Sequence, residues 1–161
     1  MKHLFFLLPW AVLATSCGTQ NNISPTQEVA PTPIADPLEA YGTTTPDPSL
    51  HDIWGLEAMQ GKAAIAYNFT KGERPILEID TKAHRFLVSS GCNSITGRVL
   101  FGKDALRFTD VASTRMACPG LEAETAFVTT LQKAVSYTVK DQKLYLFGVD
   151  GEILLVFRKI D

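Results

Sequence analysis

Residues 143–158, KLYLFGVDGEILLVFR, consist of two apolar runs separated by a short turn. The first run covers residues 143–147, the second covers residues 152–158, and the turn contains Asp150 and Gly151. Both runs are apolar at consecutive positions, so both faces of each segment are suited to burial. We therefore predict two strands in the interior of a sheet.

Short strand-like segments precede this pair. Residues 76–80 and 85–89 flank a polar turn, and residues 98–101 and 105–108 flank a second turn at 102–104. Each pair is typical of a β-hairpin. Residues 53–58 begin the folded part with Trp54, which we expect in the core, and residues 136–139 form a further strand.

One helix is indicated, over residues 121–135. This stretch contains no Gly or Pro, and its apolar side chains recur at helical spacing. Glu122 and Glu124 favour its positive N-terminal end. Together the elements predict an α+β domain over residues 50–161, with a curved, barrel-like, mainly antiparallel β-sheet and one covering α-helix.

The first residues are typical of a targeting signal rather than of a folded element. A short basic start precedes the apolar run at residues 4–14, which is too short to cross a bilayer and is typical of a secretory signal. The small residues before Cys17 resemble the bacterial lipobox. We expect residues 1–16 to be a lipoprotein signal peptide and Cys17 to be acylated, the alternative being an ordinary signal peptide that leaves a free thiol.

A tether is expected to follow. Six of the nine prolines fall between residues 18 and 49, among Thr, Asn, Gln, Ser and Asp. Such a composition cannot bury enough apolar surface to fold, and proline favours extended spacers. Residues 17–49 are therefore predicted to be a lipidated cysteine followed by a disordered tether, which places the protein on a membrane of the bacterial cell envelope.

The charge pattern excludes one class of partner. The formal net charge is −2, and the 15 Lys and Arg residues form no dense cluster. Nucleic acid binding needs concentrated positive charge, so we do not expect it. The chain is expected to be a monomer.

Three stretches together resemble one family. They are Trp54-Gly55-Leu56 followed by Met59-Gln60-Gly61, then Gly91-Cys92-Asn93 with Gly97 four residues on, and the run ASTRMACP at residues 112–119. Their order and spacing are similar to those of the META domain family, which includes the HslJ-like heat-shock lipoproteins. The resemblance covers nearly all of residues 50–161.

The resemblance implies a modest set of properties. META-domain proteins are mostly envelope or secreted proteins, often lipid-anchored, and are associated with stress tolerance, including novobiocin-type antibiotic resistance. The family has no established enzymatic activity or cofactor. We therefore expect a non-enzymatic envelope protein with a binding or structural role and no cofactor. Because the family fold is similar to that of some small protease inhibitors, inhibition of a secreted protease is the alternative.

Cys92 and Cys118 are the strongest candidates for a specific role. With Cys17 assigned to the lipid, two cysteines remain in an oxidising compartment. They are expected to form a disulfide. The alternative is two buried, reduced thiols that never meet.

Arg115 and Asn93 are candidates for contact with a protein partner. The Arg115 guanidinium could bind a carboxylate, or it could order the loop before the helix, which is the favoured interpretation. A nucleophilic site of Cys92, His51 or His84, and Asn93 is less favoured than two solvated histidines. No spacing of His, Cys or carboxylates matches a metal site, so neither catalytic nor metal-binding residues are predicted.

Overall fold

The computed structural model describes residues 41, 45, 47–102 and 104–160. Cys17, the signal segment and nearly all of the tether lie outside the described residues. In chain order the elements are η2 (Pro48–Leu50), β1 (Ile53–Met59), β2 (Lys62–Ala63), η3 (Ala64–Ala66), η4 (Thr70–Gly72), β3 (Ile76–Asp80), β4 (Arg85–Ser89), β5 (Ser94–Phe101), β6 (Leu106–Ser113), α1 (Leu121–Gln132), β7 (Ser136–Lys140), β8 (Lys143–Phe147) and β9 (Ile153–Lys159).

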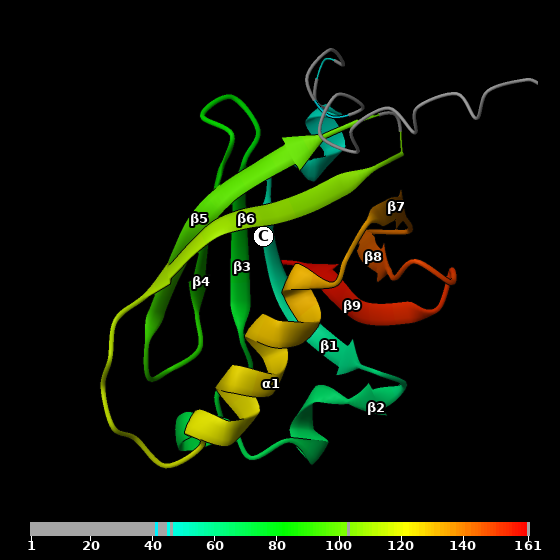
Figure 1. Ribbon diagram of the computed structural model, residues 1–161. Helices are drawn as coiled ribbons and strands as arrows, with labels where there is room; N and C mark the ends of the chain where they lie inside the picture. The colour runs from blue at the N-terminus through cyan, green and yellow to red at the C-terminus, as the bar shows by residue number, and fades with distance from the viewer. Residues whose placement is uncertain (1–40, 42–44, 46, 103, 161) are drawn as a thin grey trace, which may run out of the picture. The chain divides into compact units, whose positions relative to one another are not determined.

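The strands form one antiparallel sheet in the order β6-β5-β4-β3-β1-β9-β8-β7, and β2 pairs with the end of β1. Figure 1 shows α1 in front of this curled sheet, between β6 on one side and β7–β9 on the other. The predicted α+β class, with a curved antiparallel sheet and one covering helix, is confirmed.

The two edge strands meet at one end of the sheet. Ala105 forms an isolated bridge with Ser136. The Leu106 amide donates to the Val135 carbonyl at 3.1 Å, and the Tyr137 amide donates to the Asp104 carbonyl at 3.2 Å. The sheet therefore curls far enough to bring β6 and β7 into contact, which gives the half-barrel its enclosed interior.

Helix α1 fills this interior with aromatic and aliphatic side chains. The Phe127 ring packs edge-on against Phe157 of β9, with ring centroids 6.2 Å apart, and against Phe69 at 6.5 Å. Phe127 and Leu131 are fully buried. Trp54 is 1% exposed, as expected for a core residue, and its indole N–H donates to the Leu50 carbonyl.

The last two strands, β8 and β9, form at the two apolar runs and lie inside the sheet. β9 pairs with β1 on one side and β8 on the other, and β8 pairs with β9 and β7. Neither strand is at an edge, so the prediction of interior strands is confirmed. Their inward side chains Leu144, Leu146, Leu155 and Phe157 have no exposed surface.

The β5–β6 hairpin is much longer than its predicted arms. Thr96, Arg98, Thr109 and Asp110 interrupt the apolar pattern because their side chains are exposed or half-exposed on the sheet. The pairing also shifts register between Thr96 and Arg98. At Gly97 a Cβ atom would lie 2.5 Å from the Phe86 ring, so only glycine admits this close approach.

Helix α1 ends at Gln132, three residues earlier than predicted. The amides of Lys133 and Ala134 bond three residues back, which tightens the last turn. The Val135 amide already donates to the Phe147 carbonyl at 2.9 Å, so sheet pairing ends the helix. Within the described part of the chain, no helix is long and apolar enough to span a membrane.

Candidate functional site

The segment between β6 and α1 is the most exposed part of the family-like motif. Residues 112–117 are all exposed, and Met116 retains 58% of its surface. The Arg115 side chain makes no hydrogen bond or ion pair with the other described residues. We call residues 113–118 the Arg115 loop.

Asn93 fixes this loop on both sides of Arg115. Its side-chain oxygen accepts hydrogen bonds from the Thr114 hydroxyl at 2.9 Å and from the Met116 amide at 2.8 Å. Asn93 is only 3% exposed, so it lies beneath the loop and positions it. The structure thus brings Arg115 and Asn93 together, with Arg115 on the surface and Asn93 as its support.

A buried carboxylate holds Asn93 in turn. Glu124 of α1 is 4% exposed, and it accepts bonds from the Asn93 side-chain amide at 2.6 Å and the Asn93 backbone amide at 3.1 Å. The Ser90 hydroxyl is a third donor. A buried carboxylate is tolerated when its oxygens are satisfied in this way. Its place in the first turn of α1 adds the favourable field of the helix dipole.

A covalent link completes the support. Cys92 and Cys118 form a disulfide with Cα atoms 6.1 Å apart. It ties the turn that contains Asn93 to the C-terminal end of the Arg115 loop. The loop is therefore held by a disulfide at one end and by two hydrogen bonds in its middle, and Arg115 projects from a constrained backbone.

A groove of about 770 Å³ separates the loop from α1. Its apolar lining includes Val111, Met116, Leu121 and Val128, and Leu121 is 42% exposed. Arg115 also lines this groove. Partly exposed apolar side chains beside Arg115, which is unpaired among the described residues, suit a protein partner that offers an apolar side chain and a carboxylate.

The alternative nucleophilic set is not assembled. The Cys92 sulfur is bonded to Cys118, and both histidines are engaged elsewhere. His51 accepts from the Thr81 amide at 3.2 Å, and the His84 ring lies against Phe101. No group of three or more His, Cys, Asp or Glu side chains within residues 47–102 and 104–160 is placed to hold a metal.

Sequence reasoning missed Glu124 and Ser90 as parts of the site. Glu124 was interpreted only as a charge that favours the helix N-terminus, in the same way as Glu122. The structure separates the two, since Glu122 is exposed and Glu124 is buried against Asn93. The buried position one turn into the helix, on the same face as Phe127 and Leu131, was the available signal.

Comparison with known proteins gives a family and a fold. The family model of the META domain matches residues 48–161. A solved structure of a protein from Burkholderia xenovorans is 23% identical, with a TM-score of 0.56, and the match covers 74% of this chain and 94% of that one. A second solved structure is 21% identical, with a TM-score of 0.51, and the match covers 68% of this chain and 90% of that one. A comparison with curated proteins found no match.

Proposed function

Because this chain belongs to the META domain family, we propose that it is a lipid-anchored protein of the bacterial cell envelope. It binds a protein partner through the Arg115 loop and catalyses no reaction. The observation that carries this proposal is the exposed Arg115 side chain between two neighbours that buried Asn93 holds in place.

The geometry of the loop favours binding. A surface that is already ordered loses less conformational entropy when a partner docks, so more of the contact energy appears as affinity. The Arg115 guanidinium presents several donors in a planar fork that matches a carboxylate. We infer that the partner offers an Asp or Glu side chain to Arg115 and an apolar side chain to the neighbouring groove.

The proposed membrane anchor rests on the N-terminal sequence. An apolar run, small residues and then Cys17 support cleavage before Cys17 and acylation of its sulfur. Acyl chains would hold the domain at the membrane, since each buried methylene contributes about 0.8 kcal/mol. Labelled palmitate should enter the wild-type protein and should not enter the Cys17→Ser variant.

A contribution to envelope stress tolerance is the biological part of the proposal. It is tested by deleting the gene in the organism of origin and comparing growth under heat and under novobiocin. The wild-type gene should restore tolerance, whereas the Arg115→Ala variant should not. Arg98→Ala, which removes an exposed arginine of β5, is the matched control and should restore it.

Two results would contradict this account. If the deletion strain grows like its parent under both stresses, the chain has no part in tolerance to them. If Arg115→Ala restores tolerance as fully as the wild type, the Arg115 loop is not the binding site.

A second candidate function is inhibition of a secreted protease of trypsin-like specificity. The observation that favours it is the arrangement at Arg115, an exposed basic residue on a loop constrained by a disulfide and by Asn93. Such proteases accept a basic side chain in a pocket that contains an aspartate. The full chain should then inhibit trypsin at stoichiometric concentration, and Arg115→Ala should abolish the effect. Rapid cleavage after Arg115 without inhibition would exclude this function.

A further inference from the structure

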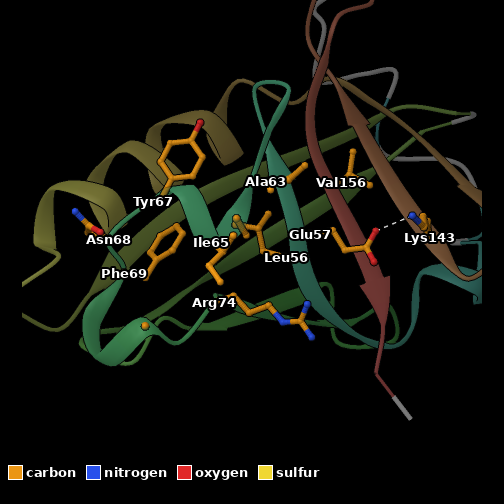
Figure 2. Close-up of a pocket in the computed structure, with 13 residues that line it drawn as sticks. Leu56, Glu57, Ala63, Ile65, Tyr67, Asn68, Phe69, Arg74, Lys143 and Val156 are labelled. Atoms are coloured by element: carbon orange, nitrogen blue, oxygen red, sulfur yellow. Dashed lines mark ion pairs between the residues drawn. The ribbon is translucent and has the colours of Figure 1, made fainter.

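A second groove, remote in sequence from the Arg115 loop, lies between β1 and β9 and the segment at residues 63–74. It has a volume of about 900 Å³. Figure 2 shows Tyr67, Asn68 and Phe69 along one side, and Glu57, Val156 and Lys143 along the other. This volume falls within the range of small-molecule sites in proteins.

The groove is held in shape by the protein itself. The Tyr67 hydroxyl donates to the Met59 carbonyl of β1 at 2.8 Å, and the Thr70 hydroxyl donates to the Pro119 carbonyl. Phe69 is 5% exposed and packs against Phe127 in the core. The wall opposite β1 is therefore anchored at three points, so the groove exists before any ligand arrives.

Most of the lining is apolar. Ile65 is 93% exposed, the largest exposed fraction among the large hydrophobic residues of the described chain. It projects beside Leu56 in Figure 2, and the remaining apolar lining includes Ala58, Ala63 and Val156. Covering an isoleucine that is exposed to this degree, beside small apolar side chains, with an apolar chain lowers the free energy of the system.

Of the two cations that line the groove, Arg74 has no counterion among the described residues. Glu57 forms ion pairs with Lys143, at 2.7 Å, and with Arg158. The bonds from Lys143 and Arg158 hold the pKa of Glu57 below its ordinary value, so this carboxylate is ionised and already engaged. Arg74 makes no ion pair or hydrogen bond with any other described residue.

Arg74 lies at the edge of the apolar lining. Its Nε atom would be 3.7 Å from a Cβ placed on Gly55, so the Arg74 side chain lies against β1, next to the Ile160 side chain that covers the same glycine. Figure 2 shows Arg74 at the end of the groove below Ile65. An anion bound there would extend from the guanidinium toward the apolar lining.

We propose that this groove binds a free single-chain carboxylate of the fatty-acid type. The hydrocarbon chain lies against Ile65 and its apolar neighbours, and the carboxylate pairs with Arg74. A peptide fits less well, because its main-chain amides need hydrogen-bond partners. The Tyr67 hydroxyl is already bonded, and among the described residues Asn68 is the lining side chain whose amide groups make no hydrogen bond. This site is separate from the Arg115 loop.

The test is calorimetric titration of the full chain with sodium decanoate. Decanoate should bind saturably, and Arg74→Ala should weaken binding by about tenfold, the effect of losing one charge-assisted contact. Ala63→Trp, which fills the groove from an exposed position, should abolish binding. Arg98→Ala is the matched control and should bind as the wild type does.

A comparison of ligands separates the carboxylate contact from apolar adsorption. 1-Decanol, which has the same chain without the charge, should bind the wild type about tenfold more weakly than decanoate. Absence of saturable decanoate binding would overturn the proposal. So would equal affinity for decanoate and 1-decanol, or an Arg74→Ala variant that binds decanoate as tightly as the wild type. None of these results would bear on the proposed binding of a protein partner at Arg115.

Discussion

Replacement of Asn93 by alanine tests the support of the Arg115 loop. The substitution removes the bond from the Asn93 side-chain amide to the Glu124 carboxylate, and it removes the acceptor shared by Thr114 and Met116. It leaves the disulfide and the backbone bond to Glu124 in place. The variant therefore isolates the contribution of one buried side chain.

The expected loss follows from these three bonds. A bond to a charged group contributes about 1.5–3 kcal/mol, and each neutral bond contributes about 0.5–1.5 kcal/mol. Water can replace the partners of Thr114 and Met116 in part, because both residues are exposed. We expect the free energy of unfolding to fall by about 3 kcal/mol, most of it from the Glu124 bond.

Equilibrium unfolding in urea, with the disulfide intact, measures this change. Asn68→Ala removes an exposed amide and is the matched control, with an expected change within about 0.5 kcal/mol. Hydrogen exchange of the Met116 amide should also become faster in Asn93→Ala, because that amide loses its acceptor. An unchanged unfolding midpoint and an unchanged exchange rate at Met116 would refute the proposed support.

Four further predictions concern other parts of the domain. Replacing Cys92 and Cys118 together by alanine removes a disulfide between residues 26 apart in the sequence. The urea midpoint should fall, corresponding to a decrease of about 3.5 kcal/mol in the free energy of unfolding, and an unchanged midpoint would contradict this. Gly120→Ala places a Cβ 2.5 Å from a backbone oxygen, at a residue with a φ of +90°. The free energy of unfolding, measured by thermal denaturation, should fall by at least about 2 kcal/mol, whereas wild-type stability would show that the backbone can adjust. Hydrogen bonds from Lys143 and Arg158 lower the pKa of Glu57, so the stability that its ionised form contributes is present above its ordinary pKa of 4.5 and is lost as the pH falls through the lower pKa of the folded state. Glu57→Gln should therefore reduce the loss of unfolding free energy at acid pH, and an unchanged acid dependence would refute the pairing. Burial, with two nearby carboxylates, raises the pKa of Tyr137 from 10.0 to about 12, so one late-titrating tyrosinate absorbance should disappear in Tyr137→Phe, and its persistence would assign that titration to another tyrosine.

The sequence determined the core elements because their signals are local. The apolar runs that became β8 and β9 and the helical spacing around Phe127 and Leu131 depend on neighbours a few residues away. The full length of β5 and β6 was missed, since the outward side chains of a half-exposed strand carry no apolar pattern. In such a segment pairing, rather than composition, defines the strand.

The support of the candidate site was harder to predict for a different reason. Arg115 and Asn93 were found through the family-like motifs, whereas Glu124 lies 31 residues from Asn93 in the chain. Glu122 and Glu124 both lie in the first turn of α1, and helical spacing places Glu124 on the buried face with Phe127. That spacing does not identify its partners, which lie in the turn at Ser90 and Asn93. Contacts between distant segments set the role of such a residue.

In-cell photo-crosslinking from the Arg115 loop tests the central claim most directly. A photoreactive amino acid replaces Ala117, an exposed neighbour that leaves the Arg115 guanidinium in place, in one strain, and Lys140, an exposed residue at the end of β7, in a second strain. We expect one envelope protein to be recovered from position 117 and not from position 140, and its yield to fall when Arg115→Ala is added. Equal recovery from both positions, or no protein above background at position 117, would contradict binding through the Arg115 loop.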